Sequence, residues 1–181
     1  MKPLPTPTQT VGPFFHDCLL RSDVPRDVLA GPAIDGAVIH ISGFIYDGDG
    51  VGVPDAMLEW WHADPHAEFS GFGRVGTAAD GAYTFTAVRP GRVQYHENVR
   101  QAPHISLVIF ARGLLNHLFT RIYLPNEPSN ADDPILRRVP ADRRSTLIAR
   151  HDSSGVRDSE HVYRFDVVLQ GAGETVFFDF K

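Results

Sequence analysis

A stretch of alternating residues from His104 to Arg112 constrains the fold of this chain more than any other segment. Successive side chains of a β-strand point to opposite faces, so the odd-numbered residues here (Ile, Leu, Ile and Ala) would share one wholly apolar face. That face predicts a strand that covers a hydrophobic core. On the other face, a histidine at position 106 would join His104 in a two-imidazole metal clamp, but the chain has Ser106 there. The segment therefore resembles a metal-binding strand with half of its ligands missing.

Short segments rich in β-branched and aromatic residues recur along the chain, with turn signals such as Asp-Gly and Pro-Gly between them. The strands that this pattern predicts are 37–46, 56–63, a hairpin with 77 and 83–86 on either side of Asp80-Gly81, 104–112, 119–123, 161–169 and 175–180. Evenly spaced short strands with little helical periodicity are typical of an all-β fold. We therefore expect an antiparallel β-sandwich or barrel-like core with long loops.

Two regions lie outside this pattern. Residues 1–36 hold six of the fourteen prolines and are expected to form an extended arm that lies on a partner. Residues 140–149 are expected to form one short helix with Pro140 near its first turn. The chain shows no internal repeat and no second-domain boundary, so we expect one domain over residues 1–181, with 37–181 as the β core.

Composition argues against nucleic acid and a membrane as partners. The formal net charge is −5 and the arginines are scattered in short pairs, which disfavours nucleic acid. No apolar run approaches the roughly 20 residues of a membrane span, and the Pro-rich start lacks the apolar run of a secretory signal. Cys18 is the only cysteine, so no internal disulfide is expected and a cytoplasmic location follows.

Four segments together resemble the intradiol ring-cleavage dioxygenase family. They are residues 8–16 (TQTVGPFFH), 58–64 (LEWWHAD), 102–112 (APHISLVIFAR) and 171–180 (GAGETVFFDF). They occur in the family's order through nearly the whole chain, so the resemblance is more specific than any single motif. It implies the family's all-β fold and the O2-dependent cleavage of a catechol ring at ferric iron, Fe(3+).

The resemblance also implies that this chain lacks the family's iron ligands. Intradiol enzymes hold ferric iron with two tyrosines and two histidines, because phenolate and imidazole stabilise Fe(III). The positions that match the second tyrosine and the second histidine are Val93 and Ser106. No tyrosine lies between Trp61 and Asp80, where the other one would fall. His104 is then a vestigial position, and we expect no metal ligand and no catalytic residue in this chain.

The residues leave one alternative metal site open. Tyr95 and His96 precede His104 by fewer than ten residues, and together they could form a rearranged iron site. Apart from this set, the chain contains no complete catalytic constellation. It has no Gly-x-Ser-x-Gly elbow, and Cys18 has no adjacent base.

Arg112 is the first candidate for substrate binding. The resemblance extends to the non-iron-binding alpha subunits of two-chain members of the family. Arg112 matches an arginine of these subunits that contributes to a substrate pocket shared with the beta subunit. A guanidinium is planar and always charged, and it can grip a carboxylate with two parallel hydrogen bonds. From the residues alone, a surface ion pair at a strand end is the alternative role.

The arm supplies the other candidates. Thr10, Gly12, Pro13 and Phe14 match a segment that, in the alpha subunits, lines the mouth of the partner's active site. Gly12 would let the backbone approach a ligand closely, and Pro13 would fix its direction. Phe14 stands where the family often has tyrosine, so the hydroxyl's hydrogen bond is lost and a packing role is left.

The function that the resemblance implies is shared between two chains. A homologous beta subunit would bind the iron, and this chain, inactive alone, would shape the pocket and hold the substrate carboxylate. The implied reaction inserts both atoms of O2 into protocatechuate (3,4-dihydroxybenzoate) and yields 3-carboxy-cis,cis-muconate in bacterial aromatic catabolism. Two alternatives stay open: an autonomous iron dioxygenase with an atypical ligand set, and a non-enzymatic β-sandwich binding or assembly module.

Overall fold

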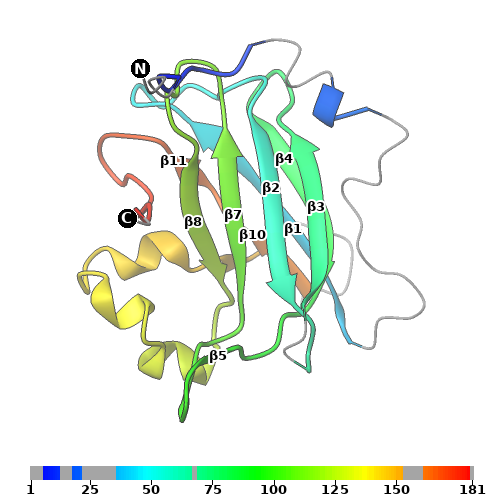
Figure 1. The fold of residues 1–181 in the computed structure, drawn as a ribbon, viewed down its shortest axis with the longest axis vertical. Coiled ribbons are helices and arrows are strands. Elements are labelled where there is room, and N and C mark those ends of the chain that lie inside the picture. Colours follow the sequence, from blue (N-terminus) through cyan, green and yellow to red (C-terminus); the bar gives the residue numbers. More distant parts are fainter. Residues whose placement is uncertain (1–5, 13–17, 22–35, 67–68, 153–160, 180–181) are drawn as a thin grey trace, which may run out of the picture.

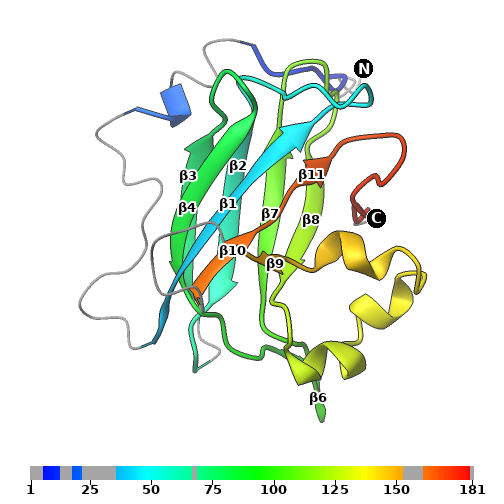
Figure 2. The ribbon, with the colours of Figure 1, turned by 180° about the vertical axis from the view of Figure 1, so that it is seen from behind.

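Two β-sheets face each other across a shared apolar core in the computed structural model of this chain (Figure 1, Figure 2). The structure describes residues 6–12, 18–21, 36–66, 69–152 and 161–179. Among these residues, strands dominate, and the helical segments that follow β8 are short 3-10 turns. The predicted β-sandwich is therefore confirmed.

The first sheet is mixed. Its strands are β1 (Val38–Tyr46), β4 (Ala82–Val88), β9 (Arg150–His151), β10 (Val162–Arg164) and β11 (Val167–Val168). Strand β1 pairs antiparallel with β4 on one side and parallel with β10 and β11 on the other. The parallel pairs arise because the chain returns to β1 only after crossing the other sheet, so it can enter this sheet in the same direction as β1.

The second sheet is antiparallel throughout. Its order is β3 (Phe69–Gly76), β2 (Met57–Ala63), β7 (His104–Phe110) and β8 (Leu118–Tyr123). A small hairpin of β5 (Gln94–His96) and β6 (Val99–Arg100) extends beyond the ends of both sheets (Figure 1). Three 3-10 segments follow β8: η1 (Pro128–Asp132), η2 (Leu136–Arg138) and η3 (Arg144–Leu147).

The alternation of β7 works as the sequence predicts. Ile105, Leu107 and Ile109 are fully buried and contribute to the core between the sheets. In the opposite sheet, β1 shows a similar alternation of buried and less buried residues. Trp60 of β2 stacks on Phe85 of β4 with ring centroids 4.9 Å apart, so an aromatic pair joins the two layers.

Two predicted strand arrangements are wrong. The turn at Asp80-Gly81 forms, with Gly81 at φ +84°, but it does not close a hairpin. It carries the chain from one sheet to the other, because β3 pairs with β2 and β4 pairs with β1. Turn chemistry alone cannot reveal which edge each strand joins.

The strand predicted over 104–112 ends earlier, at Phe110, because the next residues turn and Gly113 has φ +89°.

The later part of the chain also differs from expectation. Residues 161–169 form two strands and not one, interrupted where the Phe165 carbonyl accepts a hydrogen bond from the Tyr83 hydroxyl at 2.6 Å. Within the described part of 175–180 there is one isolated bridge, between Phe178 and Phe119. The predicted helix over 140–149 shortens to the single 3-10 segment η3.

A buried carboxylate fastens the long segment after β8 to the second sheet. Asp133 is fully buried. Its Oδ2 accepts the N–H of Ala102 at 2.7 Å, and its Oδ1 accepts the hydroxyl of Tyr123 at 3.0 Å and the N–H groups of Ile135 and Leu136 at 2.9 and 2.7 Å. These donors come from three parts of the chain, so one side chain joins β8, the approach to β7 and the 3-10 segments.

Removing this carboxylate should therefore destabilise the fold. Asp133→Ala leaves several buried donors without an acceptor, and we expect the free energy of unfolding to fall by about 3 kcal/mol. Tyr123→Phe removes one of the donors and should cost about 1 kcal/mol. Urea denaturation of both variants measures the difference. Equal costs would contradict the anchoring role of Asp133.

Candidate functional site

Arg112 lies at the end of the second sheet where β2 begins and β7 ends. The two strands are antiparallel and pair Met57 with Phe110. Two steps further along the same register, position 55 falls opposite position 112. The structure joins them: Nη2 of Arg112 lies 2.5 Å from Oδ2 of Asp55. Both side chains are exposed, by 63% for Arg112 and 47% for Asp55, so the guanidinium can reach a second anion.

The N-terminal arm passes the same sheet end. The N–H of Gly113 donates to Oγ1 of Thr10 at 2.9 Å, a contact between residues 103 positions apart. Residues 6–12 run beside the turn between β7 and β8 in both views (Figure 1, Figure 2). A Cβ placed on Gly12 would meet nothing within 4 Å, so Gly12 faces open space in this chain. Arm and arginine, far apart in sequence, are thus brought together.

The other two arm candidates, Pro13 and Phe14, lie outside the described residues. Of the predicted substrate-binding residues, the structure therefore places Thr10, Gly12 and Arg112. The surface ion pair that the residues alone suggested for Arg112 is present, but its acidic partner, Asp55, was not identified from the sequence. The signal that could have found it is the antiparallel pairing of β2 with β7, which single-sequence patterns do not supply.

His104 lies at the opposite end of β7, in a buried setting. It is 8% exposed, and its Nδ1 donates to the carbonyl of Ala102 at 2.8 Å. Its ring packs against Tyr123 with centroids 5.7 Å apart. Burial, and secondly the nearby charge of Arg121, lower the pKa of His104 to about 4. The imidazole is therefore neutral at neutral pH.

The residues around His104 do not suit ferric iron. Ser106, at the position of the second histidine, pairs across the sheet with Arg121, whose guanidinium would repel a cation. The hydroxyl of Tyr123 donates to Asp133, and burial raises the pKa of this phenol, which opposes the phenolate form. In the part of the chain that the structure describes, no three His, Cys, Asp or Glu side chains gather as metal ligands would.

The alternative iron ligands, Tyr95, His96 and His104, make two separate ring contacts. Tyr95 packs edge-on against His96, with ring centroids 4.3 Å apart, in the β5–β6 hairpin. His104 packs instead against Tyr123 of β8. The contacts that the structure gives these rings thus pair them with different neighbours.

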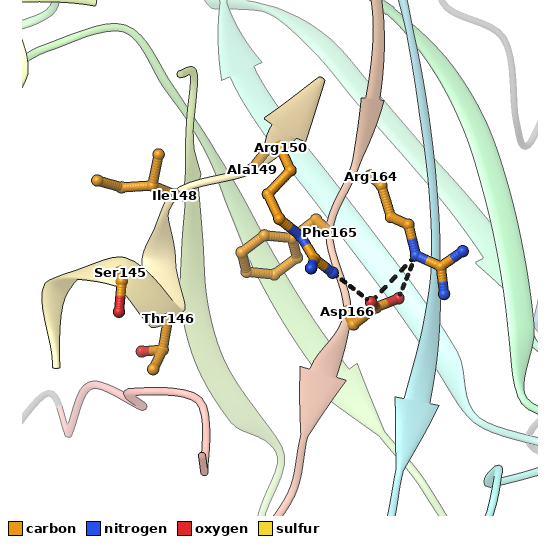
Figure 3. A pocket seen from close by; sticks show the side chains of 8 residues that line it. All are labelled: Ser145, Thr146, Ile148, Ala149, Arg150, Arg164, Phe165 and Asp166. Atoms are coloured by element: carbon orange, nitrogen blue, oxygen red, sulfur yellow. Dashed lines mark hydrogen bonds and ion pairs between the residues drawn. The ribbon is translucent and has the colours of Figure 1, made fainter. Parts of the chain in front are cut away.

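Two surface hollows offer less for an anionic ligand. One, of about 440 Å³, is lined by η3, β9 and the end of β10 (Figure 3). There, Arg150 and Arg164 both contact the carboxylate of Asp166, which also accepts the N–H of Phe44 at 3.1 Å. This carboxylate offsets the arginine charge and ties three strands together, which is a structural task. The second hollow, of about 570 Å³, is lined by residues 116–119 and 177–179, where Asp179 would repel a carboxylate.

Three glycines of β3, at 71, 73 and 76, have the Gly-x-Gly-x-x-Gly spacing of a dinucleotide-binding turn. That turn requires the N-terminus of a helix directly after a strand. Here the glycines lie inside β3, and the chain continues through a turn into β4. The spacing therefore has no phosphate-binding geometry.

No helix among the described residues has the length and apolar character needed to cross a membrane.

The fold and this sheet end define a β-sandwich protein that presents an exposed arginine beside its N-terminal arm. A family model described as Dioxygenase matches residues 12–171. The chain is 42% identical to the protocatechuate 3,4-dioxygenase alpha chain of Burkholderia cepacia, over 96% of both chains. It is 29% identical to the beta chain from the same organism, over 92% of this chain and 76% of that one.

Solved structures of dioxygenases have a similar fold. The dioxygenase domain of a dioxygenase and carbohydrate-binding fusion protein from Streptomyces sp. SirexAA-E has 27% identity and a TM-score of 0.63, over 93% of this chain and 99% of that one. An intradiol ring-cleavage dioxygenase from Tetranychus urticae shares the fold, with a TM-score of 0.64 at 16% identity, over 82% of this chain and 88% of that one. This chain belongs to the intradiol dioxygenase family, whose enzymes are ring-cleaving oxidoreductases. The resemblance noted from the sequence is confirmed.

The buried state of His104 predicts a pH dependence of stability. The pKa is lower in the folded chain than in the unfolded one, so the contribution of His104 is complete above pH 6.5 and is lost as the pH falls toward 4. We expect this loss to be about 3 kcal/mol. Denaturant unfolding of His104→Gln across this range should show a flatter pH dependence of the free energy of unfolding than the wild type.

The exposed His96 offers a control, His96→Gln, whose free energy of unfolding should follow the wild type. Identical slopes for His104→Gln and the wild type would contradict the assignment.

Proposed function

We propose that this chain is the non-iron-binding, alpha-type subunit of a protocatechuate 3,4-dioxygenase. In this proposal, a homologous beta subunit carries ferric iron, and this chain completes the substrate pocket of that subunit. The observation that carries the proposal is the hydrogen bond from Gly113 to Thr10, which brings the arm beside Arg112 at one exposed sheet end.

The comparisons support a two-chain enzyme. Relatives of this chain include both an alpha chain and a beta chain of protocatechuate 3,4-dioxygenase, and the identity to the alpha chain is higher. The partner would thus be a homologue of similar fold. Assignment of the iron to the partner rests on the poor fit of the residues around His104, where Arg121 lies across from Ser106.

Arg112 would hold the carboxylate of protocatechuate and so fix which edge of the ring enters the partner's site. Its exposed guanidinium retains donors beyond the one that contacts Asp55. The arm, with Thr10, Gly12, Pro13 and Phe14, would border the pocket and help to exclude water. Together with the partner, the complex would use O2 to open protocatechuate between its hydroxyls, giving 3-carboxy-cis,cis-muconate.

The proposal includes a setting and an organisation. One β domain would span residues 1–181, with residues 1–36 as the arm that lies on the partner. A single cysteine suits a reducing compartment, so we place the hetero-oligomer in the cytoplasm.

The role of Arg112 is testable with two substrates. Arg112→Ala removes a charge-assisted contact worth about 1.5–3 kcal/mol, or roughly a ten- to hundredfold loss of kcat/KM for protocatechuate. Catechol has no carboxylate, so its turnover should fall much less. Arg112→Lys should restore part of the activity, since a point charge cannot reproduce the forked geometry. Steady-state kinetics of the complex reconstituted with the beta subunit measures both substrates.

A matched control is Arg143→Ala, which removes another exposed arginine that faces an acid, Glu174, at 3.9 Å. We expect this variant to leave the preference between the two substrates unchanged. Equal losses on protocatechuate and catechol in Arg112→Ala would mean that Arg112 supports the structure and does not recognise the carboxylate.

A further inference from the structure

We propose that Asp55 is the positioning residue for Arg112: it holds the guanidinium at the angle from which Arg112 grips the carboxylate of the substrate. The inference rests on the proposed function, because it assigns Asp55 a task in the same recognition step. It concerns how the arginine is oriented, which neither the resemblance nor the comparisons address.

The backbone at Asp55 is firmly placed. Asp55 has φ +61°, a left-handed conformation that aspartate and asparagine tolerate better than most residues. The next residue, Ala56, is clamped on both sides by Thr77: its N–H donates to Oγ1 of Thr77 at 3.0 Å, and its carbonyl accepts the N–H of Thr77 at 2.8 Å. The Thr77 hydroxyl also donates to the carbonyl of Val53 at 2.8 Å. The carboxylate of Asp55 therefore projects from a braced turn.

The side chain of Arg112 needs a contact that restrains it, and Asp55 supplies one. Arg112 follows the end of β7, and its long side chain is 63% exposed, so packing restrains this side chain little. An unrestrained arginine loses rotamer freedom when it binds a ligand, and that loss lowers affinity. Contact with Asp55 orders the side chain before the substrate arrives.

The geometry leaves the arginine able to bind a second anion. The contact joins one nitrogen, Nη2, to one oxygen of Asp55. A guanidinium has five N–H donors in a fixed plane, so donors are left for the substrate carboxylate. The charge of Asp55 attracts Arg112 but also repels the incoming carboxylate. These two effects oppose each other, so orientation is the main contribution of Asp55.

Two substitutions separate orientation from charge. Asp55→Asn keeps an oxygen acceptor of the same shape and tolerates a positive φ, so it should leave kcat/KM for protocatechuate within about twofold of the wild type. In Asp55→Gly, the glycine also tolerates the positive φ, but the carboxylate that contacts Arg112 is removed. We expect the KM for protocatechuate to rise about two- to tenfold in Asp55→Gly, the factor that corresponds to ordering one long side chain.

Other readouts exclude a merely structural effect. In Asp55→Gly, kcat should stay near the wild-type value, and the kinetics on catechol should change little, because only carboxylate binding is affected. The Asp55→Gly/Arg112→Ala double variant should be no worse than Arg112→Ala alone, because Asp55 acts through Arg112. Glu174→Ala, which removes a comparably exposed acid facing Arg143, serves as the control and should change neither KM.

The experiment is steady-state kinetics of the reconstituted complex on protocatechuate and catechol. An unchanged KM in Asp55→Gly, equal losses on both substrates, a loss in Asp55→Asn as large as in Asp55→Gly, or additive losses in the double variant would each overturn the positioning role. These outcomes leave the proposed function standing so long as Arg112→Ala remains selective for protocatechuate. Loss of that selectivity would instead overturn the proposed function itself.

Discussion

The antiparallel register of β2 against β7 sets both the core and the candidate site. It turns Ile105, Leu107 and Ile109 toward the opposite sheet, where they are fully buried. The same register, carried past the ends of the two strands, sets Asp55 opposite Arg112. A slip of one residue would move the apolar side chains of β7 to the outer face, so core burial and site geometry are specified together.

The outer face of β7 carries one buried histidine and a serine where a two-imidazole metal clamp would have two histidines. His104 is buried with its Nδ1 bonded to a carbonyl, and Ser106 lies across from Arg121. Asp133 holds the neighbouring segment through Tyr123 and Ala102. The polar residues at this end of the sheet thus serve the stability of the chain, while the opposite end, with Arg112 and Thr10, is exposed and able to contact a ligand.

The sequence predicted the features that depend on local pattern. The strict alternation from His104 onward predicted β7 and its buried face, and the family resemblance pointed to Arg112 and the arm. The sequence did not predict the features that depend on pairing between distant strands. The turn at Asp80-Gly81 is visible in the sequence, but its passage between sheets depends on the partners of β3 and β4. Asp55 was missed for the same reason, because its contact follows from the register of two strands about fifty residues apart in the chain.

We propose that this chain completes an iron enzyme without binding the iron itself, and the metal content of each chain tests this proposal. Elemental analysis and visible absorption spectra should be recorded for this chain alone, for the beta subunit and for their complex. We expect no stoichiometric iron in this chain alone. The complex should contain iron and show a tyrosinate-to-iron absorption band, and this iron should remain with the beta subunit. Tightly bound, stoichiometric iron with such a band in this chain alone would contradict the assignment of the iron to the beta subunit.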